Sequence, residues 1–387
     1  MKALMNIKWK HYINYIVVGA FTIYLAYMAF AGDMPRSQTT LYADIGVTII
    51  LAVSLSMVVG FLGELSLGHA GFMCVGAYVG GKLAAMFTEM FTGLSEYIVF
   101  VIALVVGGLA AMLCGFIIGL PALRLRGDYL AIVTLAFGEI VRIIFLNSGG
   151  VFGDQSGMKT PRLDREILPL IAFILVLVTL FVTQNIIRSK HGRAITAIRD
   201  SEIAAKATGI NVTKYKLMVF AIAALFAGIA GVLSSYTENK IQAATYDYNY
   251  SIEILVIVVL GGMGSINGAI VASVLITYIN NVLQTQLQGN MAVLKNLIYA
   301  IVLIVIVIYN NAPALKGFRE TYNIKNLFSK IFAKKHDPSK VHDDEAKWDR
   351  VPTKIEIDEI LSVDIQPGSP THLISHKRRI NNVESCS

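Results

Sequence analysis

Two ionisable residues, Glu139 and Arg142, lie within an apolar segment that covers about residues 129–146. In a helix that rises about 1.5 Å per residue, Glu139 would lie about 16 Å from the start of the segment, close to the middle of a bilayer. A charge at that depth costs about 2.5–3.5 kcal/mol on insertion scales, so it needs a partner or a watery cavity. Arg142 is three residues later and shares the same helix face. The two residues predict either a self-neutralising pair between helices or a polar patch on the path of a transported solute.

Two glycine-rich sequences interrupt apolar segments: GELSLGHAG at 63–71 and GGMGSING at 261–268. Several glycines weaken a continuous helix, so each sequence predicts a break. Broken membrane helices can present backbone groups to a zwitterionic solute, whereas the alternative is close helix packing, which also requires glycine. Glu64 and His69 flank the first break, and we expect them at the membrane interface rather than as ligands. Besides Glu139 and Arg142, the residues expected on a solute pathway are Ser66, Gly68, Gly71, Gly261, Gly262 and Gly264.

No catalytic constellation is visible in the sequence. The phosphate-binding pattern GxxxxGK followed by Ser or Thr does not occur, and neither does the zinc pattern HExxH. The three cysteines, Cys74, Cys114 and Cys386, have no metal-ligand spacing with a second Cys or His. We therefore expect no catalytic residue, no metal and no cofactor held by this chain itself.

The composition is that of a membrane protein. Of the 387 residues, 55% are hydrophobic and only 15% are charged, and the mean hydropathy is +0.62. Soluble domains carry about 25% charged residues. The formal charge of +7 does not indicate nucleic acid, because the basic residues concentrate in loops and a tail. The sequence predicts an all-α, polytopic helical membrane protein.

About ten transmembrane helices are expected between residues 13 and 310. The apolar stretches cover about residues 13–31, 41–61, 72–87, 97–120, 129–146, 167–187, 217–236, 251–260, 269–283 and 293–309. Residues 1–12 form a basic N-terminus, and residues 33–40 read as a polar loop. Residues 311–387 are polar and basic at first, which is typical of a disordered tail.

The distribution of basic residues predicts the orientation. With a cytoplasmic N-terminus, the inner loops would hold Lys2, Lys8, Lys10, Arg124, Arg126, Arg188, Lys190, Arg193, Arg199, Lys206 and Lys214. The outer loops would hold Arg36, Lys159, Arg162, Arg165 and Lys240. Ten spans return the basic tail to the cytoplasm, whereas nine would place it outside.

The polar interval at 188–215 predicts a short surface helix on the cytoplasmic side, near residues 194–209. Asp200 or Ser201 can begin a helix, and Gly209 can end it. The apolar residues of this interval, which would form a sparse apolar face, are Ile195, Ile198, Ile203 and Ile210.

Four motifs, in order along the chain, resemble those of the permease subunit of bacterial branched-chain amino-acid ABC transporters. They are GELSLGHAGFMCVGAY, LRGDYLAIVTLAFGEIVRIIFLN, SEIAAKATGINVTKYKLMVFAIAALFAGIAGVL and EILVIVVLGGMGSINGAI. They cover much of residues 45–285. The basic tail after residue 315 is longer than such permeases usually carry.

The resemblance implies an importer of Leu, Ile and Val in the bacterial plasma (inner) membrane, with both termini in the cytoplasm. It implies that ATP is bound by two separate ATP-binding cassette subunits rather than by this chain. A second, homologous permease and an extracytoplasmic solute-binding protein would complete the system, with no nucleic acid. The helix near 194–209 is similar to the family's coupling helix, which docks on the ATPase. The residues that match its pattern are Glu202, Ala204, Ala205 and Gly209.

Three alternatives remain open on the sequence. A urea or short-chain amide permease of the same superfamily would have the same glycine-broken segments. An ion-coupled secondary transporter would need intramembrane carboxylates, such as Glu139 and Glu253. An integral-membrane enzyme would need a catalytic cluster, which the sequence lacks.

Overall fold

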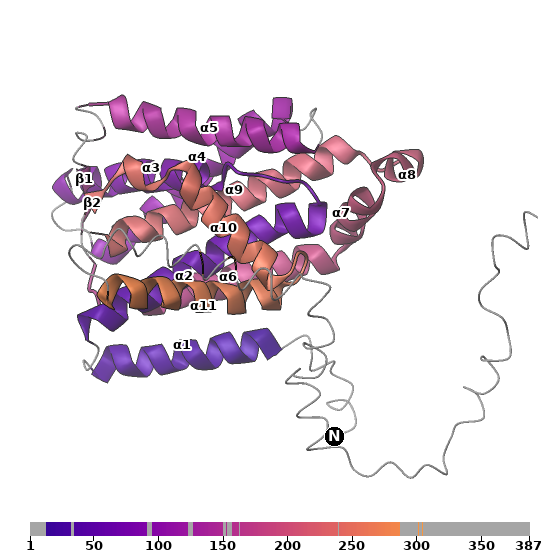
Figure 1. The fold of residues 1–387 in the computed structure, drawn as a ribbon. Helices are drawn as coiled ribbons and strands as arrows, with labels where there is room; N and C mark the ends of the chain where they lie inside the picture. The colour runs from indigo at the N-terminus through magenta and orange to yellow at the C-terminus, as the bar shows by residue number, and fades with distance from the viewer. Residues whose placement is uncertain are drawn as a thin grey trace, which may run out of the picture. The chain divides into compact units, whose positions relative to one another are not determined.

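The computed structural model describes residues 13–31, 35–90, 95–122, 127–149, 152, 157–161, 163–238, 240–286, 301 and 304. Figure 1 shows that these residues are mainly helical. The α-helices are α1 (Ile13–Ala31), α2 (Arg36–Ser56), α3 (His69–Met90), α4 (Glu96–Ala122), α5 (Asp128–Asn147), α6 (Leu168–Arg188), α7 (Lys190–Asp200), α8 (Glu202–Ala207), α9 (Val212–Thr237), α10 (Tyr248–Gly261) and α11 (Ile266–Gln286). The remaining elements are a π-helical turn η3 (Met57–Leu62), a 3-10 turn η4 (Ala243–Thr245), and β1 (Met158–Lys159), which pairs antiparallel with β2 (Lys240–Ile241).

The prediction of a polytopic helical membrane protein is confirmed. Seven of the described helices are long and apolar enough to cross a bilayer, and α1 and α10 are shorter apolar helices. A helix coincides with each apolar stretch predicted as a span between residues 13 and 283. Apart from Ile301 and Ile304, the stretch at 293–309 lies outside the described residues, as does the tail at 311–387, so a total of ten spans stays a prediction.

The prediction of a polar loop at 33–40 is wrong for the second half of that stretch, because α2 begins at Arg36. Pro35 precedes the helix in an extended conformation, with φ −61° and ψ 143°. The threonines that made this stretch look like a loop bond within the helix instead. The hydroxyls of Thr39 and Thr40 donate to the carbonyl oxygen of Arg36 at 2.9 and 3.2 Å, so their polarity does not oppose a helix.

Small residues let α3, α4 and α9 approach one another closely. A Cβ atom added to Gly76 in α3 would collide with the carbonyl oxygen of Gly228 in α9. A Cβ added to Gly107 in α4 would lie 2.9 Å from the carbonyl oxygen of Gly76. Van der Waals packing of this kind is the main attraction between helices in lipid, where the hydrophobic effect between them is absent. The glycines at 76, 107 and 228 therefore form the centre of the bundle.

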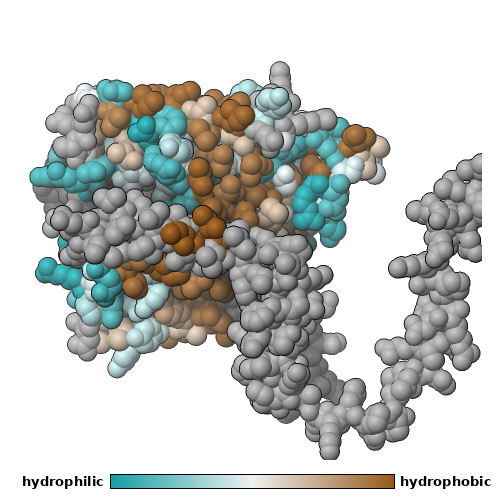
Figure 2. Space-filling view, viewed as in Figure 1, coloured by the Kyte–Doolittle hydropathy of each residue, from teal (hydrophilic) through white to brown (hydrophobic). Residues whose placement is uncertain are grey.

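The helix α2 is enclosed by its neighbours, whereas several other helices expose large apolar side chains. In the most apolar stretch of α2 and η3, 89% of the residues are buried. The corresponding share is 28% for α5 and 22% for α11. On the face shown in Figure 2, hydrophobic residues gather over the middle, between α7–α8 and the β1–β2 pair. In a membrane protein this exposed apolar surface is the part that contacts lipid.

The polar elements lie at the two ends of the long helices. Figure 1 shows α7 and α8 at one end and the β1–β2 pair at the other. The chain order agrees, because α9 begins directly after α8 and ends next to β2. We call these the α7–α8 end and the β1–β2 end.

The replacement Gly76→Ala should destabilise the bundle, because its methyl group has no space against the Gly228 backbone. Overpacking of this kind costs about 1–3 kcal/mol. Gly19→Ala in α1 is the matched control, since a Cβ there meets nothing within 4 Å. Thermal unfolding of the purified chain in detergent should show a lower Tm for Gly76→Ala alone. Equal Tm values for the two variants would contradict the packing described.

Candidate functional site

The polar interval between α6 and α9 folds into two short helices rather than the single helix expected near 194–209. The hydroxyl of Ser189 accepts a hydrogen bond from the backbone NH of His191 and caps α7, while Ser201 accepts one from Ala204 and caps α8. Ser201 adopts an extended conformation, with φ −160° and ψ 108°, and this separates the two helices. As expected, Gly209 ends α8 in the left-handed region, with φ +84°.

One residue of the predicted apolar face is misplaced. Ile195 and Ile198 are buried, and Ile210 packs against the core, but Ile203 is 75% exposed. The bend at Ser201 turns α8 relative to α7, so Ile203 cannot continue the face formed by Ile195 and Ile198. In α8, Ala205 is the buried residue, while Ala204 and Ala207 are exposed with Ile203.

A network of ion pairs connects α8 to the first glycine break and to α9. Lys216 in the second turn of α9 is only 3% exposed, and its Nζ atom contacts the carboxylate of Glu64. The same Nζ atom donates to Glu202 of α8 at 3.2 Å, and Glu202 also accepts from Lys206 at 2.7 Å. Glu64 lies just after η3, so Lys216 connects the end of α2–η3 to α8. Because the lysine is buried, these contacts are screened less than surface ion pairs.

The charge of Glu202 is stabilised by this network. The hydrogen bond from Lys206 holds the pKa of the Glu202 carboxyl below its ordinary value of 4.5; partial burial opposes this shift, and the charge of Lys216 adds to it. A group with a lowered folded-state pKa stabilises the fold fully above its ordinary pKa and loses that contribution as the pH falls through the lowered value. The contribution of Glu202 to stability is therefore present at neutral pH and is lost in acid.

Arg199, near the end of α7, contacts the first glycine break and lies beside the second. Its Nη1 atom donates to the carbonyl oxygen of Gly60 at 3.2 Å, and a Cβ atom on Gly63 would lie 2.6 Å from its Cγ atom. A Cβ atom on Gly264 would lie 3.8 Å from Nη1. Gly60 and Gly264 are themselves packed so closely that a Cβ on Gly60 would collide with the Gly264 amide. The two breaks thus meet at one point, beneath the guanidinium of Arg199. We call Gly60, Gly63, Gly264 and Arg199 the glycine joint.

The backbone of the first break is occupied by protein partners. The NH of Leu67 donates to the Thr134 hydroxyl of α5 at 3.0 Å, and the NH of Ala70 donates to the Ser251 hydroxyl of α10 at 3.1 Å. In this conformation these two NH groups are bonded within the protein. The break ties α3 to α5 and α10.

Close packing, the alternative considered for the first break, accounts for two of its predicted residues. A Cβ atom on Gly68 would lie 2.6 Å from the carbonyl oxygen of Thr134, and one on Gly71 would lie 2.6 Å from Cα of Gly138. Ser66 is 1% exposed, and its hydroxyl has no hydrogen-bond partner among the described residues. Their place on a solute pathway stays a prediction.

Glu139 and Arg142 form the pair that their spacing predicts. The carboxylate of Glu139 lies 2.8 Å from Nη2 of Arg142. Its other oxygen accepts a hydrogen bond of 2.9 Å from the backbone NH of Tyr248, at the start of α10. The space between Glu139, Gly71 and Tyr248 has no room for a water molecule. In this conformation the pair joins α5 to α10.

The second break is a turn between α10 and α11. Gly262 and Gly264 adopt positive φ angles of 91° and 82°, which favour glycine. A Cβ atom on Gly261, at the end of α10, would lie 2.5 Å from the backbone of Ala269 in α11. The turn brings α11 back against α10, and Gly264 at its tip reaches Gly60.

Sequence reasoning placed His69 wrongly and missed several residues of this site. His69 is 1% exposed and lies 2.8 Å from the Ser54 hydroxyl, so it is in the core rather than at an interface. Lys216 was missed because it fell between the polar interval, which ends at residue 215, and the predicted span, which starts at residue 217; the structure begins α9 at Val212. The contact of Arg199 with Gly60 joins residues 139 positions apart, which no local pattern reveals.

The replacement Lys216→Met should destabilise the protein, because it leaves Glu64 and Glu202 partly buried without their shared counter-charge. Breaking a buried pair costs about 3–5 kcal/mol. Adding Glu64→Gln to Lys216→Met should recover part of that loss, which a double-mutant cycle of unfolding in detergent would measure. The control is Lys214→Met, at an exposed position two residues away. A Lys216→Met protein as stable as this control would refute the role of the network.

The described residues contain no group of His, Cys, Asp or Glu side chains that could hold a metal ion. The contacts described above form a closely packed and charged connection between helices. Two helices at one end of the bundle are connected, by Arg199 and Lys216, to the points where the long helices break.

Comparisons with known proteins give the site a context. Residues 39–307 match the family described as branched-chain amino acid transport system / permease component. The high-affinity branched-chain amino acid transport system permease protein LivM of Salmonella typhimurium is 39% identical over 260 residues, which cover 59% of this chain and 59% of that protein. The LivM protein of Escherichia coli is 35% identical over 310 residues, which cover 72% of this chain and 70% of that protein.

A more distant similarity is shorter. The ribose import permease protein RbsC of Escherichia coli is 27% identical over 150 residues, 37% of this chain and 46% of that protein. No solved structure matches. Since the family match covers well over half of the sequence, this chain belongs to the family of branched-chain amino acid transport system permease components.

Proposed function

We propose that this chain is the transmembrane permease subunit of an ATP-binding-cassette importer that carries Leu, Ile and Val into the cell. It has no enzymatic activity of its own, and separate subunits bind and hydrolyse ATP. The observation that carries the proposal is the glycine joint, because one residue of α7 bonds the backbone at the first break and lies beside the second. An element at the end of the bundle can thereby act on the interior.

The exposed surface of α8 supports docking of an ATPase subunit. Ile203 is 75% exposed, and the small residues Ala204 and Ala207 are exposed beside it. A large apolar side chain flanked by small residues suits insertion into a groove of a partner. The residues that resemble the coupling pattern have two different roles. Ala204 is exposed and available to a partner, whereas Glu202 and Ala205 attach α8 to its own subunit.

Movement of α8 would reach the interior by two routes. Glu202 and Lys216 connect it to Glu64, after η3. The preceding helix, α7, reaches Gly60 and Gly264 through Arg199. The first route ends just after the π-helical turn η3, and the second reaches Gly60 within it; such turns are rare and occur frequently at functional sites. ATP binding by the partner would shift the population between two arrangements of these helices.

The orientation proposed from the basic residues places the α7–α8 end in the cytoplasm of a bacterium, with both termini on that side. The chain would lie in the plasma (inner) membrane. Two ATPase subunits would dock at this end, a second permease would complete the pore, and an extracytoplasmic binding protein would deliver solute to the β1–β2 end.

The names of the relatives favour branched-chain amino acids over urea or short amides as the solute. The geometry gives little support to an ion-coupled secondary transporter. Glu139, one carboxylate that such a mechanism would use, is paired with Arg142 and also accepts a hydrogen bond from the backbone NH of Tyr248.

The coupling assignment can be tested with Glu202→Lys and Gly209→Pro. The first places a third positive charge beside Lys206 and Lys216. The second is incompatible with the φ of +84° at Gly209, since proline requires about −65°. Both variants should insert into the membrane, yet ATP hydrolysis by the reconstituted complex should no longer drive uptake of L-leucine.

Leucine uptake per ATP hydrolysed should fall at least tenfold in both variants. Glu89→Lys is the control for charge reversal, because Glu89 is exposed near the C-terminal end of α3, whereas the first glycine break precedes the N-terminal end of that helix. Normal uptake in both variants would exclude the coupling role of α8. Uptake by wild-type protein that persists without ATP and collapses with an ion gradient would exclude the importer itself.

A further inference from the structure

Basic residues gather where the end of α6 and the beginning of α9 meet the beginning of α7. Lys190 and Arg193 are among the first four residues of α7, and Lys214 is the third residue of α9. Arg188 is the last residue of α6. All four residues are exposed. We call Arg188, Lys190, Arg193 and Lys214 the basic patch.

A contact between two rings shows that the beginnings of α7 and α9 lie side by side. The ring centroids of His191 in α7 and Tyr215 in α9 are 5.8 Å apart. His191 follows Lys190 directly, and Tyr215 follows Lys214 directly. The basic residues of two separate helices therefore belong to one surface. Because both helices begin here, the positive ends of their dipoles add to the charge of the side chains.

The positive charge of the basic patch is not balanced by neighbouring carboxylates of the described residues. Lys190, Arg193 and Lys214 form no ion pair with another described residue. The nearest acidic residues along the chain are Asp200 and Glu202, at the other end of α7. Each of them already has a basic partner there. The basic patch therefore favours an anionic partner from outside the chain.

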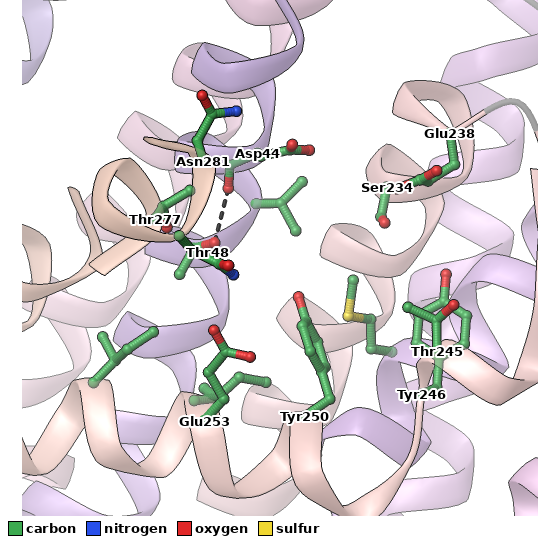
Figure 3. A pocket seen from close by; sticks show the side chains of 15 residues that line it. Asp44, Thr48, Ser234, Glu238, Thr245, Tyr246, Tyr250, Glu253, Thr277 and Asn281 are labelled. Atoms are coloured by element: carbon green, nitrogen blue, oxygen red, sulfur yellow. Dashed lines mark hydrogen bonds between the residues drawn. The ribbon is translucent and has the colours of Figure 1, made fainter. Parts of the chain in front are cut away.

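The carboxylates that line the cavity in Figure 3 are too far away to change this balance. Glu238, one of them, follows the last residue of α9, whereas Lys214 is in the first turn of the same helix. At about 1.5 Å per residue, the helix separates these two charges by about 36 Å. That is several times the Debye length of about 8 Å at physiological salt, so solvent ions screen the attraction between them.

An exposed apolar stripe on α6 leads to the basic patch. Ile174, Val178 and Phe181 are 47%, 46% and 60% exposed. Their spacing of four and three residues places them on one face of the helix, and the same spacing continues to Asn185 and Arg188, which are also exposed. In a membrane protein, lipid tails cover such an apolar face. The basic patch therefore begins where a lipid-facing surface ends.

The apolar stripe and the basic patch together match the two parts of one anionic phospholipid. Acyl chains suit the stripe, and a negatively charged headgroup suits the patch, because lysine and arginine beside the end of a membrane helix attract anionic lipids. An acidic protein surface would also match the charge, but it would have no use for the apolar stripe that continues into the bilayer. The combined surface therefore favours a lipid.

We propose that the basic patch binds the headgroup of an anionic phospholipid whose acyl chains lie along Ile174, Val178 and Phe181. The bound lipid holds the beginning of α7 at the membrane surface. Arg199 of the glycine joint is near the other end of the same helix, so the lipid restrains the element that carries this residue. This inference goes beyond the proposed function and requires only that the chain spans a membrane.

The test places the full chain in nanodiscs that contain equal amounts of phosphatidylglycerol and phosphatidylcholine with the same acyl chains. Native mass spectrometry then counts the lipids that remain bound after the disc is removed. Bound phosphatidylglycerol should exceed bound phosphatidylcholine at least fivefold, because the two lipids present the same tails to the stripe and only the first carries a net negative charge.

The combined replacement Lys190→Gln, Arg193→Gln and Lys214→Gln should lower this excess at least threefold. The three residues are exposed, so the Tm of the variant should equal that of the wild type. The matched control removes three exposed basic residues from the β1–β2 end and should keep the full excess: Lys159→Gln, Arg165→Gln and Lys240→Gln.

Three results would overturn the proposal. The first is equal retention of the two lipids by the wild-type protein. The second is an equal loss of selectivity in both triple variants, because net charge alone would then attract the lipid. The third is unchanged selectivity in the patch variant together with loss of a copurifying ATPase subunit, which would assign the basic patch to a protein contact. None of these measurements requires transport, so failure of the importer proposal would leave the lipid result standing.

Discussion

The close approach of Gly60 to Gly264 is the contact on which the rest of this structure depends. No other residue type fits there, because a Cβ atom on Gly60 would occupy the position of the Gly264 amide. The contact holds the end of the buried helix α2 against the turn between α10 and α11. Arg199 covers it from α7 and bonds the carbonyl oxygen of Gly60. Packing and a single charged hydrogen bond thus connect a short peripheral element to the most enclosed helix of the bundle.

The two ends of the bundle have different physical characters. At the α7–α8 end, the charges around α8 are paired: Lys216 joins Glu64 and Glu202, and Lys206 adds a second partner. Such pairs give a rigid attachment through which a docked partner can act. At the β1–β2 end, carboxylates surround a cavity without basic lining residues among those described.

Sequence patterns predicted the spans well, because long apolar segments have few alternatives to a helix in a membrane. The Glu139–Arg142 pair, the cap at Ser201 and the stop at Gly209 were also accessible, since each depends on neighbours within four residues or on one residue's own conformation. The bend that turns Ile203 outward was not, because it depends on a single extended residue.

Contacts between distant segments were beyond local reasoning. Lys216 meets Glu64 across 152 positions, and the sequence shows neither residue to be paired. The glycines of the first break illustrate a different limit. Their pattern correctly indicated an interruption, but glycine serves both backbone exposure and close packing. Only the acceptors, the hydroxyls of Thr134 and Ser251, show that two NH groups of this backbone are bonded within the protein in the present conformation.

The central claim is that Arg199 transmits movement of α7 and α8 to the second break. Pulsed electron paramagnetic resonance would detect this movement as a change in the distance between two spin labels. One label replaces Met263, which lies in the second break and is 67% exposed, and the other replaces Glu89, which is exposed near the C-terminal end of α3. In the complex with its ATPase partner, ATP binding should change this distance, and Arg199→Ala should abolish the change while ATP still binds. A distance that ATP leaves unaltered in a transporting complex, or that changes equally in Arg199→Ala, would contradict the account.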